Sequence, residues 1–182
     1  MVAEAQALPE FTPLKLDFGC GPHKKEGFTG VDIHQFDGKV DIVADLTKRW
    51  PWRDSSIAEA HASHFIEHLN ASQRIHFVNE LYRTLMPGAK CLLIVPHWGS
   101  CRAYGDLTHQ WPPVSEFWFY YLSKVWRAAN APHNDKYKCD FAATWGYNMR
   151  PDLAVRNQEF QQFAFANYKE AIQDLIATLV KI

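Results

Sequence analysis

The sequence predicts an α/β fold in which helices flank a mostly parallel β-sheet. Short apolar runs with strand-like patterns recur along the first half of the chain, separated by connections or a helix. One of these runs, Lys90–Pro96, is apolar almost throughout, as expected for a central strand with both faces covered. The length of 182 residues suits a single domain.

Three strands are expected in the first quarter of the chain, and acids close the second and third. Leu14–Phe18 alternates between apolar and polar residues, and Gly27–Ile33 and Lys39–Leu46 follow it. The acids are Asp32 and Asp45. Ligands of parallel sheets bind at the carboxyl ends of the strands. Both acids are therefore placed where a ligand would bind.

A fourth strand, Ser56–Ser63, and a helix lead to the central strand. The apolar residues of this helix recur at helical spacing, at Ile75, Val78, Leu81, Tyr82 and Leu85. Ser72 is placed to cap the helix, and Pro87-Gly88 is placed to stop it.

The second half of the chain has a different pattern. A polar loop, 97–113, precedes an aromatic helix from Ser115 to about Ala129. A strand is expected within 137–149, "YKCDFAATWGYNM". A charged and amide-rich segment, 151–167, is expected to be helical, and the apolar run 174–182 is expected to be a closing strand.

Composition narrows the class of protein. The 19 basic and 20 acidic side chains nearly cancel, so charge gives no support to a nucleic-acid partner. Cys20, Cys91, Cys101 and Cys139 form no C-x-x-C pair, which is typical of reduced intracellular thiols. The N-terminus lacks a signal-peptide pattern, and no stretch approaches the roughly twenty apolar residues that span a bilayer. We therefore expect a soluble, cytoplasmic protein without a membrane partner.

The first strand runs into a glycine turn, "LDFGCG". Gly19 and Gly21 lack the Cβ atoms that would keep a ligand away from the backbone. Asp32 can accept two hydrogen bonds from a ribose diol, and Asp45 with Leu46 can border an adenine ring. These features predict an adenosine-shaped slot. The alternative is a tight turn that serves the fold alone.

These residues resemble the class I S-adenosylmethionine-dependent methyltransferases, in particular their small, methyltransferase type 11-like members. Five segments carry the resemblance in the family's order: "LDFGCG", "VDI", "ADL", "ASHFIEHL" and "NELYRTLMPGAKCLLIVP". The resemblance covers about residues 14–96 and implies a Rossmann-like sheet of seven strands with the last strand antiparallel. It also implies one methyltransferase-like domain over 1–182, with a cofactor-binding half (14–96) and an acceptor-side half (97–182).

S-adenosylmethionine is the cofactor that the resemblance implies. Asp17 and the Gly19–Gly21 backbone would face its methionine part, and Ser63 and His64 would line the floor under its sulfonium. The full implied set is Asp17, Gly19, Cys20, Gly21, Asp32, Ile33, Asp45, Leu46, Ser63 and His64. A dinucleotide-binding oxidoreductase is disfavoured, because its glycine pattern would place a third glycine at Lys24.

The chain departs from the family in the connection after the glycine turn. Only eleven positions separate Gly21 from Asp32, and Pro22, Gly27 and Gly30 lie between them. We therefore expect a first helix shortened to a turn or two, where many family members have a full helix. The cofactor cleft should be more open on that side.

The segment "HFIEH", His64–His68, matches the H-x-x-E-H pattern of inverted zinc proteases. The same residues continue the methyltransferase pattern, and the sequence marks no distant ligand. We therefore expect no metal site and expect Glu67 and His68 to line the cleft or to be structural.

The loop after the fifth strand carries the candidate catalytic residues His97, Asp106 and His109. In this fold the loop faces the acceptor, so an Asp-His pair can orient a general base near neutral pH. The alternative is that Asp106 and His109 only tie down the loop. Cys101 lies in the same loop, and nothing near it in the sequence marks an activated thiol.

Aromatic residues are concentrated after residue 97. Phe117, Tyr121 and Val125 fall at i, i+4 and i+8, so they should form a helix face that packs on the sheet. Trp98 and Trp111 lie in the loop and are the better candidates for a pocket.

Two functions remain open. The leading hypothesis is transfer of a methyl group from S-adenosylmethionine to an oxygen or nitrogen atom of an unidentified acceptor. The other is a non-catalytic methyltransferase-like module that binds the cofactor or a protein partner. Base-amino and cytosine-C5 methyltransferases are disfavoured, because "SHFIEH" stands where their Pro-Pro-aromatic or Pro-Cys signatures would be.

Overall fold

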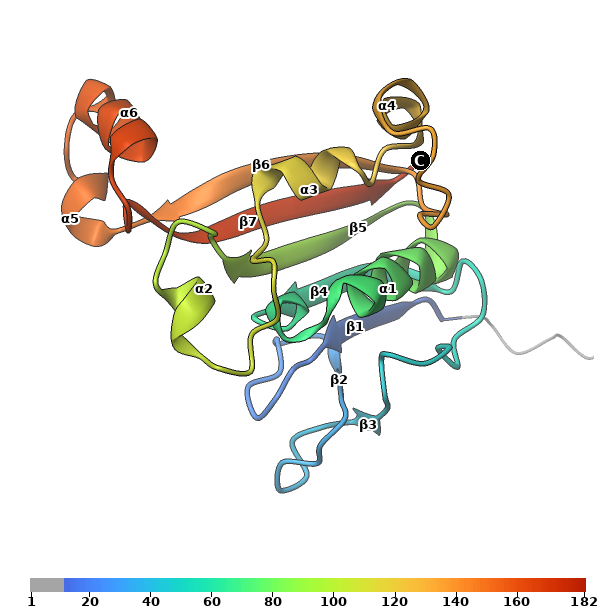
Figure 1. Cartoon of the computed structure of the whole chain (residues 1–182). Coiled ribbons are helices and arrows are strands. Elements are labelled where there is room, and N and C mark those ends of the chain that lie inside the picture. Colours follow the sequence, from blue (N-terminus) through green and yellow to red (C-terminus); the bar gives the residue numbers. More distant parts are fainter. Residues whose placement is uncertain (1–11) are drawn as a thin grey trace, which may run out of the picture.

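The computed structural model describes residues 12–182, which form one seven-stranded sheet with helices packed against it (Figure 1). The first residues of the predicted domain, 1–11, lie outside the described part. The strands are β1 (Leu14–Phe18), β2 (Thr29–Asp32), β3 (Ile42–Val43), β4 (Ile57–Ser63), β5 (Leu85–Pro96), β6 (Phe141–Met149) and β7 (Ile172–Lys181).

The strand order is β3-β2-β1-β4-β5-β7-β6. Strands β1 to β5 pair in parallel, whereas β7 runs antiparallel between β5 and β6. The expected sheet of seven strands with an antiparallel last strand is therefore confirmed. Its parallel half brings the carboxyl ends of β1, β2 and β4 to one edge, where ligands of such sheets bind.

The helices are α1 (Ala71–Thr84), α2 (Arg102–Gly105), α3 (Glu116–Tyr120), α4 (Lys124–Asn130), α5 (Pro151–Ala154) and α6 (Gln158–Asn167), with a short 3₁₀ turn, η1, at Ile66–His68. The expected helical segment at 151–167 is confirmed as α5 and α6, and Figure 1 shows both beyond one end of the β6–β7 pair. None of the helices in residues 12–182 is long and apolar enough to span a bilayer.

Strands β2 and β3 are shorter than the runs that predicted them, 27–33 and 39–46. Strand β3 lies at the edge of the sheet, so it has only β2 to pair with. Beyond β3, Asp45 accepts hydrogen bonds from the backbone and hydroxyl of Thr47, which forms a turn and ends the extended conformation.

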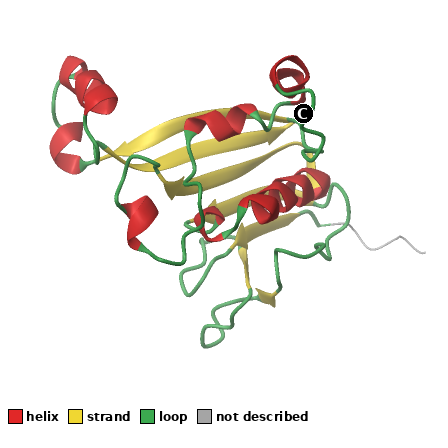
Figure 2. Ribbon diagram, in the orientation of Figure 1, coloured by secondary structure: helices red, strands yellow, loops and turns green. Residues whose placement is uncertain are grey.

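The connection between β1 and β2 contains no helix, and Figure 2 shows only loops there. Residues 19–28, where we expected a shortened helix, form turns. Gly21 and Gly27 have positive φ angles of 51° and 78°, a left-handed conformation that does not continue a right-handed helix. The first helix is therefore absent rather than shortened, and loops alone form this side of the cleft.

Helix α1 begins and ends earlier than the sequence suggested. Its N-cap is Asn70 rather than Ser72, because the Asn70 side chain accepts from the Gln73 backbone and the Gln73 side chain accepts from the Asn70 backbone. Its last residue is Thr84, and Leu85 already begins β5. The restriction that Pro87 places on the residue before it is consistent with this early end.

The predicted aromatic helix is broken into α3 and α4. Ser123 caps α4 by accepting a hydrogen bond from the Trp126 backbone, which favours a new helix start over a continuous helix. Because the helix is broken, the side chains that it buries are not the predicted ones. Phe117 and Val125, predicted to face the sheet, are 58% and 78% exposed, and Phe119 is buried with Leu122 instead.

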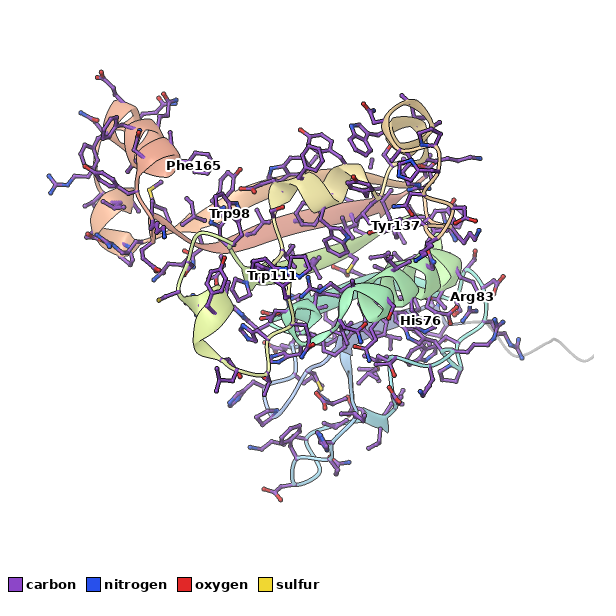
Figure 3. All side chains as sticks on the ribbon, in the orientation of Figure 1. His76, Arg83, Trp98, Trp111, Tyr137 and Phe165 are labelled. Atoms are coloured by element: carbon purple, nitrogen blue, oxygen red, sulfur yellow. The ribbon has the colours of Figure 1, made fainter. Side chains whose placement is uncertain are left out.

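One face of α1 holds the segment 48–54 against the core. On this segment Trp50 and Trp52 pack around Phe18 of β1. The Glu80 carboxylate accepts from the Trp50 backbone at 2.8 Å and from Arg83 Nη2 at 2.6 Å. Arg83, which is labelled in Figure 3, in turn donates to the Trp52 carbonyl at 2.8 Å.

Replacing Glu80 with Gln should lower the free energy of unfolding by about 2 kcal/mol at neutral pH, because a buried hydrogen-bonded charge is lost. The hydrogen bonds from Arg83 hold the pKa of Glu80 below its usual 4.5. The stabilisation is thus present above pH 4.5 and is lost as the pH falls through the lowered pKa. Urea unfolding of both proteins across this pH range tests the prediction.

The matched control is Asp54→Asn, which removes the exposed carboxylate on the other side of Arg83. An exposed ion pair contributes at most about 1 kcal/mol, so this variant should stay close to the original protein. Equal losses in the two variants, or a Glu80→Gln deficit that persists at acid pH, would contradict the role of Glu80.

Candidate functional site

A cavity of about 450 Å³ lies at the carboxyl ends of β1, β2 and β4. Its lining residues are Gly19, Asp32, Ile33, His34, Ala44, Asp45, Leu46, Thr47, His64, Phe65, His68, Leu69 and Gln73. A larger cavity of about 620 Å³ lies beside Trp118 and Tyr137 on the helical side. The smaller cavity is the stronger candidate, because it lies where parallel sheets bind ligands and contains two acids.

Asp32 and Asp45 supply the charge of this cavity. Asp32 Oδ2 accepts from the Gly21 backbone at 2.9 Å, and Oδ1 accepts from the His34 backbone at 3.0 Å. Each carboxylate oxygen has two lone pairs, so each retains one for a ligand. Hydrogen bonds from Thr47 hold the pKa of Asp45 below its ordinary value. Both acids are thus placed to accept hydrogen bonds from a ligand in the cavity.

Carboxylates hold the glycine turn in the absence of a helix. Asp17 Oδ1 lies 2.6 Å from His61 Nδ1, and Asp17 Oδ2 accepts from the Lys25 backbone at 2.7 Å. Asp41 accepts from Lys24 Nζ at 2.8 Å and from the Gly30 backbone at 2.7 Å. The loop from Gly19 to Phe28 is therefore fixed from β1, β2 and the start of β3.

Gly19 lies against the phenyl ring of Phe65. Its φ of +66° is left-handed, and a Cβ at this position would collide with the Phe65 side chain. Gly21 has a similar φ of +51°, but a Cβ there would meet no atom within 4 Å. Gly19 is thus required for both its conformation and its space, whereas Gly21 is required for its conformation alone.

The structure divides the expected cofactor residues into two groups. Six of them line the cavity: Gly19, Asp32, Ile33, Asp45, Leu46 and His64. The other four, Asp17, Cys20, Gly21 and Ser63, lie behind or beside it and do not line it. Burial raises the pKa of Cys20 to about 11, so its thiol stays protonated.

Several lining residues were not expected from the sequence, above all Phe65, Leu69 and Gln73. They come from the segment after β4, which includes η1 and the start of α1. The signal was present, because "ASHFIEHL" was one of the family-like segments. The sequence does not show which side chains of this segment face the cavity. That depends on how the folded segment packs against the glycine turn, as in the contact between Gly19 and Phe65.

The three candidate catalytic residues do not form one group. His97 is buried, its Nε2 lies 3.0 Å from Glu116 Oε1, and its Nδ1 accepts from the Gly99 backbone. Asp106 Oδ2 lies 4.0 Å from His109 Nε2, too far for a hydrogen bond. The Asp106 carboxylate accepts instead from the backbone and hydroxyl of Thr108. The Asp-His pair therefore lies at ion-pair distance without a hydrogen bond, and the Asp106 carboxylate also orders the loop through Thr108.

His109 nevertheless lies beside the cavity. Its ring centroid is 4.7 Å from that of His68, which is one of the lining residues. Next to them, His64 has a left-handed φ of 52°, and the Glu67 carboxylate raises its pKa above the ordinary value. His64 and His68 therefore do not lie on one helical face, as the inverted-protease pattern would require.

Arg74 of α1 joins the loop that carries His109 to the η1 segment. Its guanidinium donates to the carbonyls of Ile66, Gln110 and Pro112 at 3.1, 3.0 and 2.5 Å. The Gln110 backbone also donates to the Glu67 carbonyl at 2.8 Å. Burial lowers the pKa of Arg74 below that of a free guanidinium.

Neither of the two tryptophans proposed for a pocket, Trp98 and Trp111, both labelled in Figure 3, lines this cavity. Trp98 lines a different cavity together with Phe165 of α6 and donates to Glu116 Oε2 at 3.1 Å. Trp111 is 77% exposed and is not among the residues that line the 450 Å³ cavity.

Comparison with known proteins identifies the fold. No protein-family model matches the sequence, and no curated protein matches it. A SAM-dependent methyltransferase from Archaeoglobus fulgidus is 19% identical with a TM-score of 0.66, over 93% of this chain and 86% of that chain. The geranyl diphosphate C-methyltransferase of Streptomyces coelicolor A3(2) is 13% identical with a TM-score of 0.56, over 94% of this chain and 73% of that chain. The YcgJ protein of Bacillus subtilis is 13% identical with a TM-score of 0.54, over 93% and 92%. The expected Rossmann-like methyltransferase fold is confirmed.

Gly19→Ala and Gly21→Ala separate the two demands on the glycine turn. Gly21→Ala should destabilise the protein by about 1–2 kcal/mol, the cost of a left-handed alanine. Gly19→Ala should cost more, because it adds a collision with Phe65 to the same strain. Thermal unfolding of the two variants measures the difference.

The double variant Gly19→Ala/Phe65→Ala provides the control. Removing the ring should relieve the collision, so the change at Gly19 should cost less in this background than in the original protein. Equal costs at Gly19 and Gly21 would show that Phe65 does not restrict the turn.

Proposed function

We propose that the chain is a methyltransferase that uses S-adenosylmethionine and transfers its methyl group to an oxygen or nitrogen atom of an acceptor. The main support is that the glycine turn and the acids after β2 and β3 line one cavity. Their positions were expected from the sequence because each lies at a strand end, but their convergence depends on the strand order β3-β2-β1.

The cavity suits an adenosine group. Asp32 keeps an unused lone pair on each carboxylate oxygen, which matches the two hydroxyls of a ribose. Ile33 and Leu46 supply apolar side chains beside the acids, as the faces of an adenine ring require. The volume of about 450 Å³ lies within the range of small-molecule sites.

Bound S-adenosylmethionine supplies a methyl group already activated by its sulfonium, so the protein has mainly to position the acceptor. Of the three candidate catalytic residues we retain His109 for contact with the acceptor. Its Nδ1 faces the Ala103 carbonyl at 3.3 Å and must donate there, which leaves Nε2 with a lone pair. His97 has both ring nitrogens engaged within the protein.

A non-catalytic methyltransferase-like module remains the second candidate. The observation that favours it is the absence of a helix between β1 and β2, which leaves the cavity bounded by loops on that side. Both candidates predict cofactor binding unless the module has lost it, so binding is the first property to measure.

Calorimetric titration with S-adenosylmethionine and S-adenosylhomocysteine tests the proposal, and Asp32→Asn is the informative variant. This change keeps the shape of the side chain but replaces one acceptor oxygen with a donor and removes the charge. Losing a charge-assisted hydrogen bond costs about 1.5–3 kcal/mol, so we expect binding to weaken at least about tenfold.

Asp37→Asn is the matched control, because Asp37 is an exposed acid in the loop between β2 and β3 and does not line the cavity. It should bind both ligands like the original protein. Absence of binding in the folded original protein, or equal binding by Asp32→Asn, would refute the adenosine site and favour an interaction module.

A further inference from the structure

Three side chains with metal-binding atoms meet beside the cavity. One carboxylate oxygen of Glu67 and one ring nitrogen each of His68 and His109 all lie within 4.8 Å of one another. Glu67 and His68 come from η1, whereas His109 comes from the loop after α2. Because His109 lies far from the "HFIEH" segment in the sequence, the sequence marked no distant ligand for that segment, and no metal site was expected.

Glu67 is the unusual member of this group. It is only 5% exposed, and neither carboxylate oxygen has a hydrogen-bond partner among the described residues. His64 Nδ1 lies 3.2 Å from Glu67 Oε1, which is an ion-pair distance, but the two atoms do not form a hydrogen bond. Glu67 Oε2 has no hydrogen-bond partner among the described residues. A buried carboxylate is costly unless it is paired or coordinates a metal. Among the described residues His64 is thus the one group at ion-pair distance from Glu67, and it makes no hydrogen bond to the carboxylate. A metal ion would supply the missing partner.

Both histidines have Nδ1 in a hydrogen bond, which leaves Nε2 as the ring nitrogen available to a metal. Thr108 Oγ1 donates to Asp106, so it accepts from His68 Nδ1 at 3.0 Å. The Ala103 carbonyl can only accept, so His109 Nδ1 donates to it. Each Nε2 is then left with its lone pair. Metal-binding histidines commonly donate their other ring N–H to a carbonyl or to a group linked to a carboxylate, as here.

The backbone around the three residues is fixed by interactions that do not involve their side chains. Arg74 donates to the carbonyls of Ile66, Gln110 and Pro112, and the Gln110 backbone donates to the Glu67 carbonyl. The position next to His109 is thus bonded directly to Glu67. The three side chains are brought together by a rigid frame, which is what a metal site requires.

We propose that Glu67, His68 and His109 bind one divalent transition-metal ion of the zinc class at the edge of the 450 Å³ cavity. Two imidazoles and one carboxylate suit zinc and its neighbours, whereas Mg²⁺ prefers oxygen ligands alone. Three protein ligands leave at least one coordination position open. Since His68 also lines the cavity, the open position can take an oxygen or nitrogen atom of a bound molecule. Binding of the ion does not depend on the proposed methyl transfer, but it uses the His109 Nε2 lone pair, so with the ion bound an acceptor would contact the ion in place of His109.

Metal binding is measured directly on the full chain, purified without a histidine tag and stripped with a chelator. Titration with Zn²⁺ should show one saturable ion per chain, and Co²⁺ should give visible absorption bands upon binding. Mg²⁺ at the same concentration should not compete. No S-adenosylmethionine or acceptor is present, so failure here is distinct from failure of the proposed function.

Glu67→Gln and His109→Ala should each weaken Zn²⁺ binding by at least about 100-fold, because changes to groups that merely support ligands already cost about 10–100-fold. Thr108→Val should weaken it by about 10-fold, since it removes the acceptor that holds the His68 tautomer. Thr108 is exposed, so this variant tests the site even if a change at buried Glu67 prevents folding.

His133→Ala is the control, because His133 is an exposed histidine on the loop after α4. It should bind Zn²⁺ like the original protein. The proposal is overturned if the original protein binds no ion at a one-to-one ratio. It is equally overturned if Glu67→Gln, His109→Ala and Thr108→Val bind as tightly as His133→Ala, which would show adventitious binding by surface histidines.

Discussion

The guanidinium of Arg74 makes the interactions on which the η1 side of the cavity depends. It places a buried positive charge among backbone carbonyls of two segments, 66–67 and 110–112. A planar fork of donors can serve several carbonyls at once, which a lysine ammonium cannot do with the same geometry. Two further hydrogen bonds join the same segments, from the Gln110 backbone to the Glu67 carbonyl and between His68 Nδ1 and Thr108 Oγ1. Arg74 is the residue of α1 that ties both segments to the helix.

The other side of the cavity depends on carboxylates. Where a helix would normally follow the glycine turn, Asp17, Asp32 and Asp41 accept hydrogen bonds from the turn and its flanks instead. Asp32 has two tasks, because the carboxylate that fixes Gly21 is also the one proposed to bind a ribose. Ligand binding and the order of the turn should therefore be coupled.

Local sequence patterns predicted the strands and the positions of Asp32 and Asp45, because alternation and strand ends are properties of neighbouring residues. Local sequence patterns gave wrong predictions where the structure depended on competing helix caps or on contacts between distant residues. The prediction that Phe117 and Val125 pack against the sheet was wrong, because Ser123 starts a new helix and both side chains are exposed. Arg74 was missed because its partners are backbone carbonyls, which every sequence provides. The meeting of Glu67 with His109 could not be foreseen, since their contact requires the folded loop.

The adenosine site is the central element of the proposed function, and a crystal structure of the protein with S-adenosylhomocysteine tests it most directly. We expect the ribose hydroxyls to lie within hydrogen-bond distance of Asp32 and the adenine ring to lie beside Ile33 and Leu46. Electron density for the ligand in another cavity, such as the one beside Trp118 and Tyr137, would contradict this assignment. So would a cavity without ligand density at a saturating concentration.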